Sequence, residues 1–160
     1  MNAIKGLHHN AYRCRDSEET RAFYEDFLGL PMTRALRIGE TKTGRSTQAL
    51  HIFFEMGDGS FLAFFEVPGN AFDFKTQHDF DLHIALEVDN ATLDTMMAKA
   101  KAAGRELRGP ADHEFIRSIY LRDPNGYVVE LTAKTALQDG APPPDAHAIL
   151  RDWQQTKPTV

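Results

Sequence analysis

Two segments of the chain have the spacing of apolar residues that is typical of amphipathic helices. Residues 17–28 follow Asp16, which is three positions before Glu19, the residue pair of a capping box, and glycine at position 29 can close the helix. Residues 92–103 begin near Asn90 and end at another glycine, Gly104. We therefore predict a helix over each segment. Their predicted buried faces consist of Ala22, Phe23, Tyr24 and Phe27, and of Leu93, Met96, Met97 and Ala100.

Segments that follow each helix alternate between apolar and polar residues, which is typical of β-strands. We predict strands over residues 48–56, 60–67, 115–121 and 127–133, and weaker strands over residues 32–38 and 105–108. Gly57, Asp58 and Gly59 separate the first pair of strands, and the sequence Asp-Pro-Asn-Gly at 123–126 separates the second pair. Both separating sequences are typical of hairpin turns.

The order of these elements repeats along the chain. A shift of 74 residues places His9 on His83 and Ala11 on Ala85, each in a short alternating run that precedes a helix. We predict one α+β domain over residues 1–135, built from two βαβββ modules at about residues 5–67 and 82–135, with a linker at 68–81. Residues 136–160 are expected to form a proline-containing spacer and a short helix from 145 to 155. That helix would present Ile149, Leu150 and Trp153 to its own domain or to a partner subunit.

Composition excludes several classes of function. The chain has 160 residues, enough for one compact core, and a formal net charge of −5, which disfavours binding to nucleic acid or to an anionic membrane. It has one cysteine, no signal-peptide pattern and no apolar run long enough to cross a bilayer. We therefore expect a cytoplasmic protein whose partner is a small molecule.

Three polar residues stand at matched positions of predicted strands. Alternation places His83 on one strand face with Ala85 and Glu87, away from the apolar face, and His9 on the corresponding face of the first module. Glu130 interrupts an otherwise apolar strand, which is unfavourable unless the carboxylate is paired or bound to a cation. If the strands form one sheet, these three side chains can converge on its concave side. Two imidazoles and a carboxylate suit Fe(II), and Mn(II), Co(II), Ni(II) or Zn(II) less specifically.

The sequence resembles the vicinal oxygen chelate superfamily, which includes glyoxalases, bleomycin resistance proteins and extradiol dioxygenases. The resemblance is carried by Leu7-His8-His9-x-Ala11, by residues 22–30, by residues 83–88 and by residues 120–131. It implies two βαβββ modules whose strands form a curled, open mixed sheet around a divalent metal. It also implies His9, His83 and Glu130 as the metal ligands, and a homodimer.

Comparison of the two modules bears on the reaction. The hairpin alignment places Ala63 opposite Glu130, at the position where lactoylglutathione lyases have a fourth ligand, so isomerisation is disfavoured. Resemblance to extradiol dioxygenases implies that Tyr120 hydrogen-bonds a bound catecholate oxygen. The family's second acid or base would fall at Ala111, and His113 is the available substitute. We therefore predict a ring-cleaving dioxygenase that uses Fe(II) and acts on a small, catechol-like compound.

Other functions of the superfamily remain open. His51 and Phe53, on the strand that corresponds to that of Tyr120, are candidates for binding the substrate. A metal-dependent lyase, isomerase or thiol transferase of the fosfomycin-resistance type would use a similar ligand set. A non-catalytic drug-binding protein is a third possibility, but such binders generally lack the metal ligands.

Overall fold

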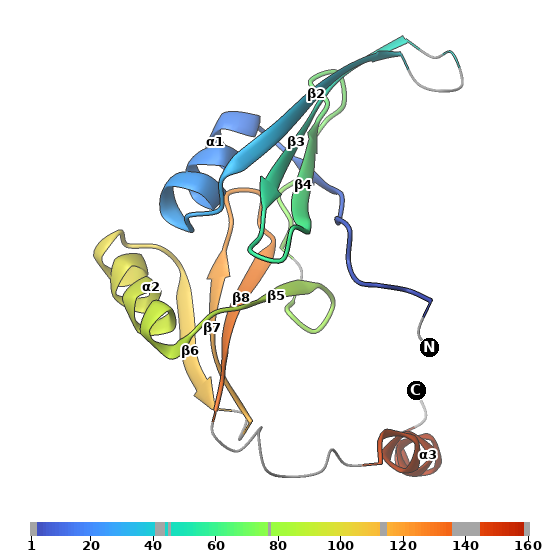
Figure 1. Ribbon diagram of the computed structural model, residues 1–160. Helices are drawn as coiled ribbons and strands as arrows, with labels where there is room; N and C mark the ends of the chain where they lie inside the picture. Colours follow the sequence, from blue (N-terminus) through green and yellow to red (C-terminus); the bar gives the residue numbers. More distant parts are fainter. Residues whose placement is uncertain are drawn as a thin grey trace.

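The computed structural model describes residues 3–40, 44, 46–76, 78–112, 115–135 and 145–158 (Figure 1). The first half contains β1 (Tyr12–Cys14), α1 (Ser17–Arg21), the π-helix η1 (Ala22–Phe27), β2 (Met32–Glu40), β3 (Ser46–Glu55) and β4 (Phe61–Glu66). The second half contains β5 (His83–Glu87), α2 (Asn90–Ala102), β6 (Leu107–Asp112), β7 (Ile116–Arg122) and β8 (Val128–Lys134). Helix α3 (Ala146–Thr156) follows.

The two halves have the same sheet topology. One sheet has the order β1-β4-β3-β2 and the other the order β5-β8-β7-β6. In each sheet the first two strands are parallel and the remaining neighbours antiparallel. No hydrogen-bonded strand pair joins the two sheets among the described residues, so the arrangement is open. Figure 1 shows α1 and α2 on one side of the sheets, which leaves the other face of each sheet uncovered by helix. The predicted α+β class and the duplicated βαβββ order are confirmed.

Both predicted helices are present, with two corrections. Asp16 accepts a hydrogen bond from the Glu19 amide at 2.8 Å, as expected of an N-cap, but the segment becomes a π-helix after Arg21. The wider turn buries both Phe23 and Tyr24. Helix α2 is capped by Asp89, whose carboxylate accepts from the Thr92 amide at 2.6 Å, and not by Asn90.

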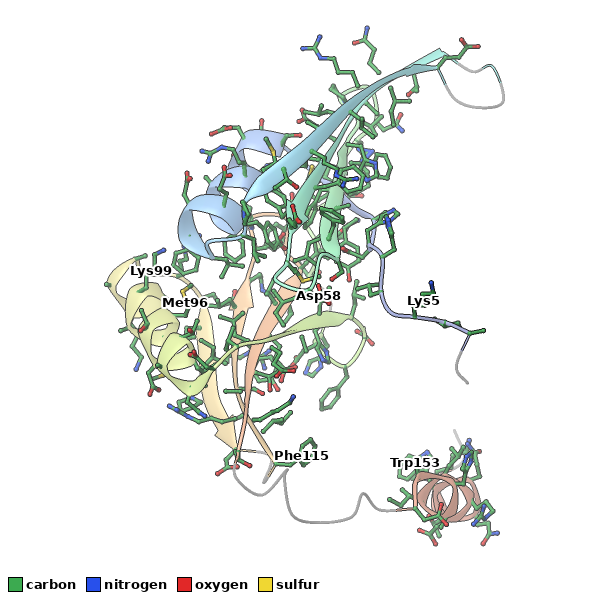
Figure 2. The ribbon with its side chains drawn as sticks, in the orientation of Figure 1. Lys5, Asp58, Met96, Lys99, Phe115 and Trp153 are labelled. Atoms are coloured by element: carbon green, nitrogen blue, oxygen red, sulfur yellow. The ribbon has the colours of Figure 1, made fainter. Side chains whose placement is uncertain are left out.

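The helix-facing sides of both sheets form one continuous apolar core. Its buried members from the first half are Cys14, Phe23, Tyr24, Phe27, Ile52, Phe54, Leu62 and Phe64. Those from the second half are Leu93, Met96, Ala100, Ile119, Leu121, Tyr127, Val129, Leu131 and Ala133. On the surface, Lys99 of α2 donates to the carbonyl of Phe27 at 2.6 Å and so connects the two helical regions (Figure 2). Neither half covers its apolar face without the other.

The predicted turn at 123–126 also connects the halves. The carboxamide of Asn125 donates to Thr20 Oγ1 at 3.2 Å and accepts from the Arg15 amide at 2.8 Å. Asp123 is buried beside it and accepts from the Tyr24 hydroxyl. Burial raises the pKa of Asp123 above its ordinary value. These polar groups, which we call the junction network, lie between the first helix and the second hairpin.

Helix α3 has no buried residue. Asp145 caps it by accepting from two backbone amides, and Ile149, Leu150 and Trp153 are all exposed (Figure 2). The predicted spacer at 136–144 lies outside the described residues. Among the described helices, none has the length and apolar character needed to cross a bilayer.

Candidate metal centre

His83 and Glu130 meet on the open face of the second sheet. Strands β5 and β8 are parallel neighbours, with Ala85 opposite Glu130, and His83 precedes Ala85 by two residues on the same face. The Nε2 atom of His83 lies 3.2 Å from Oε2 of Glu130. The His83 side chain is 38% exposed and that of Glu130 only 7%. The imidazole of His83 is therefore accessible to solvent, whereas the carboxylate of Glu130 is buried by neighbouring side chains.

The other ring nitrogen of His83 determines what this contact can do. Nδ1 lies 2.6 Å from the carbonyl oxygen of Asp79, and a carbonyl only accepts, so we assign the ring proton to Nδ1. In the neutral ring, Nε2 then directs a lone pair toward the Glu130 carboxylate. Two acceptors in contact need a cation or a proton between them. Ligands about 2.1 Å from one metal ion lie about 3.0 to 3.4 Å apart in octahedral or tetrahedral geometry, so the observed separation fits a divalent ion.

Tyr120 is adjacent to this pair. It lies directly opposite Glu130 in the antiparallel β7–β8 pair. Burial, together with the charge and hydrogen bond of Glu130, raises the pKa of Tyr120. Its hydroxyl therefore keeps its proton at neutral pH and can act as a donor. The guanidinium of Arg108 covers the Tyr120 ring, 5.1 Å from its centroid.

His9 lies with the first module. It forms an isolated bridge to Phe61, and its ring is 6.2 Å from His51 and 5.7 Å from Phe53, centroid to centroid. No contact joins it to His83 or Glu130, and the described residues contain no cluster of three His, Cys, Asp or Glu side chains suited to a metal. One chain thus brings together two of the three expected ligands.

The open face of the first sheet is aromatic. Phe53, Phe61 and Ala63 form a small buried cluster, and His51 stacks on Phe65 with a centroid separation of 3.6 Å. Burial, and then the nearby His9, lower the pKa of His51. Its Nε2 atom is buried without a hydrogen-bond partner. This face therefore offers apolar surface and one unsatisfied polar atom.

Two features of the site are not apparent in the sequence pattern. Asn10 contacts the first sheet, where its Oδ1 accepts a hydrogen bond from the Ala63 amide at 3.1 Å. Asp79 and Arg108 reach the site from a loop and from the far edge strand, so no local spacing relates them to His83. His113, the predicted second acid or base, lies outside the described residues.

A cavity of about 870 Å³ runs beside β5, between the two halves. Its lining is largely apolar and includes Leu30, Met56, Leu86 and Met96. Figure 2 labels Met96 on α2 and Asp58 in the turn on the opposite side. The cavity lining includes neither His83 nor Glu130. The candidate centre is therefore an open surface in a single chain and not part of this cavity.

Comparison with known proteins identifies the family. Residues 6–131 match the Glyoxalase/Bleomycin resistance protein/Dioxygenase superfamily. The chain belongs to this superfamily. A search of curated proteins finds no match. Membership agrees with the duplicated βαβββ order. The matched range contains positions 9, 83 and 130, where the three ligands are expected.

Several solved structures have a similar fold. A glyoxalase/bleomycin resistance/dioxygenase domain from Frankia sp. EAN1pec has a TM-score of 0.66 and 17% identity, over 83% of this chain and 100% of that one. A variant of the fosfomycin resistance protein FosX from Listeria monocytogenes, in complex with Mn(II) and 1S,2S-dihydroxypropylphosphonic acid, has a TM-score of 0.61 and 25% identity, over 85% and 98%. TnmS3, an antibiotic-binding protein from Streptomyces sp. CB03234, has a TM-score of 0.57 and 18% identity, over 84% and 100%. Proteins with a similar fold thus include one crystallised with Mn(II) and one that binds an antibiotic.

Proposed function

We propose that this chain is a divalent-metal-dependent enzyme of the ring-cleaving dioxygenase type that acts on a small aromatic compound. The proposed ligands are His83, Glu130 and His9, and Fe(II) is the preferred ion, with Mn(II), Zn(II), Ni(II) or Co(II) as substitutes. The observation that carries the proposal is the 3.2 Å contact between His83 Nε2 and Glu130 Oε2, in a histidine whose other ring nitrogen faces the Asp79 carbonyl. When bound, such an ion would offer open positions to a substrate with two adjacent oxygens.

Side chains around the proposed ligands suit an aromatic substrate. The Tyr120 hydroxyl keeps its proton and is hydrogen-bonded to Glu130, and we propose that this donor turns to a substrate oxygen when Glu130 binds the ion. Phe53 supplies apolar surface, and the unpartnered Nε2 of His51 can bind a polar substituent. Ala63 supplies no fourth ligand, which leaves more of the coordination sphere to the substrate.

A second copy of the chain is proposed to complete the ligand set. His9 contacts only first-module rings in the described structure, and the open faces of both sheets lack a helical cover. Two copies related by a twofold axis can place the first sheet of one against the second sheet of the other. Each site would then combine His9 of one protomer with His83 and Glu130 of its partner.

Metal binding and oxygen uptake test the proposal. Anaerobically Fe(II)-loaded protein should bind about one ion per chain and consume oxygen with a panel of catechols. The His83→Ala and Glu130→Gln variants should lose the ion, whereas His147→Ala, which alters an exposed histidine of helix α3, should retain it. Wild-type protein that stays metal-free after loading would contradict the proposal.

Mixing two inactive variants tests the composite site. Mixed dimers of His9→Ala and Glu130→Gln chains contain one intact site, so refolding equal amounts together should restore about one quarter of the wild-type activity. Each variant alone should stay inactive. If the mixture is also inactive although mixed dimers form, all three ligands come from one chain.

A second candidate function is favoured by the similarity to FosX. That protein, at 25% identity, was crystallised with Mn(II) and a dihydroxypropylphosphonic acid. An anionic substrate needs a cation nearby, and Arg108 lies over Tyr120 on the same face, although it is paired with Asp79. Turnover of fosfomycin by Mn(II)-loaded protein, followed by ³¹P NMR with and without a thiol, would favour this function. Oxygen uptake with a catechol would favour ring cleavage.

A further inference from the structure

The loop before β5 is anchored across the whole second sheet. Asp79 lies in this loop, yet its side chain is only 14% exposed, and its carboxylate lies 2.9 Å from Nη2 of Arg108. Arg108 belongs to β6, whereas His83 belongs to β5, and these are the two opposite edges of the sheet. The ion pair therefore spans the open face, with the guanidinium passing over Tyr120.

The same loop residue contacts His83 through its backbone. The Asp79 carbonyl accepts from Nδ1 of His83 at 2.6 Å, while the amides of Asp81 and Leu82 both donate to the carbonyl of His78. This turn and the carboxylate anchor together determine where the Asp79 carbonyl points. A hydrogen bond to one ring nitrogen sets which nitrogen of a histidine is free to bind a metal.

We propose that the Arg108–Asp79 ion pair is a positioning device, which holds the Asp79 carbonyl against His83 and so keeps the Nε2 lone pair directed at Glu130. The ion pair joins two side chains, whereas His83 is contacted by the backbone carbonyl of Asp79. The effect of the ion pair on His83 is therefore indirect. The guanidinium of Arg108 donates a hydrogen bond to the carboxylate of Asp79. This bond lowers the pKa of Asp79 and keeps its side chain ionised. The importance for metal binding rests on the proposed function, whereas the state of the ring can be measured without any metal.

The tautomer of His83 in metal-free protein is the direct test. In wild-type protein at a pH where the ring is neutral, ¹⁵N NMR should report a protonated Nδ1 and an unprotonated Nε2. In Arg108→Met and in Asp79→Asn, a population with the proton on Nε2 should appear, and Arg108→Lys should restore the wild-type spectrum in part. Arg117→Met is the matched control, because Arg117 pairs with Asp94 at 2.6 Å on the helix-covered face of the same sheet.

Metal affinity provides the second measurement. Arg108→Met and Asp79→Asn should weaken Mn(II) binding by about 10- to 100-fold, and Arg117→Met should leave it unchanged. Circular dichroism and thermal unfolding confirm that the variants fold. An unchanged His83 tautomer in both folded variants would overturn the inference even if the protein binds metal. A shifted tautomer in a protein that never binds metal would support the positioning role and contradict the proposed function.

Discussion

The hydroxyl of Tyr24 donates a hydrogen bond to the carboxylate of Asp123, 3.1 Å away and 99 residues later in the sequence. Both side chains are buried, and the bond joins the π-helix of the first half to the second hairpin. The junction network therefore places the open face of one sheet relative to that of the other. Its strength decides how firmly the two sheets of one chain are held relative to each other.

Removing the hydroxyl should destabilise the protein. In Tyr24→Phe one acceptor position of the buried Asp123 loses its partner, and the free energy of unfolding should fall by about 1–3 kcal/mol. Urea denaturation measures the change. A double-mutant cycle with Asp123→Asn isolates the coupling between the two side chains. Additive effects of the two substitutions would mean that the hydrogen bond contributes nothing of its own.

The same carboxylate should make stability depend on pH. Because burial raises the pKa of Asp123, the folded protein binds more protons than the unfolded chain between the unfolded and folded pKa values. This contribution to stability is complete below the unfolded pKa and is lost as pH rises through the folded pKa. The Asp123→Asn variant should lack it, so wild-type stability relative to the variant should fall as pH rises from acid toward neutral. Urea denaturation of both proteins over that range measures the difference, and a constant difference would contradict the assignment.

Gly126 should not tolerate a side chain. Its φ is +97°, and a Cβ added there would lie 2.1 Å from the carbonyl oxygen of Lys75, in the segment that links the halves. Gly126→Ala should therefore cost about 3 kcal/mol or more, measured as the change in urea midpoint. Gly57→Ala is the control, because nothing lies within 4 Å of a Cβ added at Gly57. Its effect should stay within about 1 kcal/mol, and equal losses in the two variants would contradict the steric explanation.

Replacing His51 should stabilise the folded protein and weaken substrate binding. Its buried Nε2 has no partner, so His51→Leu should stabilise the free protein by about 1 kcal/mol, even though it loses the stacking on Phe65. Substrate binding should weaken, seen as a higher KM, because the polar atom on the aromatic face is gone. Thermal unfolding and steady-state kinetics test the two effects separately. Phe65→Leu serves as the control that alters stacking without removing a polar atom.

Much of the fold follows from local patterns. Both helices begin and end close to the predicted positions because capping and glycine closure depend on neighbouring residues, as at Asp16 and Gly104. The hairpins follow from their turn sequences. The π-helix does not, because it depends on the fit of Phe23 and Tyr24 into a core that the second half completes. The second helix is predicted to begin near Asn90, which has a residue type suited to a cap, yet Asp89 occupies the capping position.

The candidate site was predictable only in part. Strand alternation correctly places His83 and Glu130 on one face, because both belong to regular neighbouring strands. The position of His9 relative to them depends on how two sheets are arranged, which no local spacing encodes. Likewise, the turn at Asp123 and Asn125 is predictable as a turn, but its burial against Thr20 depends on docking of the halves. The metal role of all three predicted ligands stays a prediction.

The continuous core shared by the two halves has a consequence for how such a chain can be divided. A chain of one module would expose the face that the other module now covers, and two such chains would have to associate to bury it. The linker makes that association intramolecular, which corresponds to an effective concentration in the millimolar range for a short connection. Separately expressed halves should therefore assemble only when their concentrations exceed the dissociation constant of the core interface, and each half alone should be prone to aggregation.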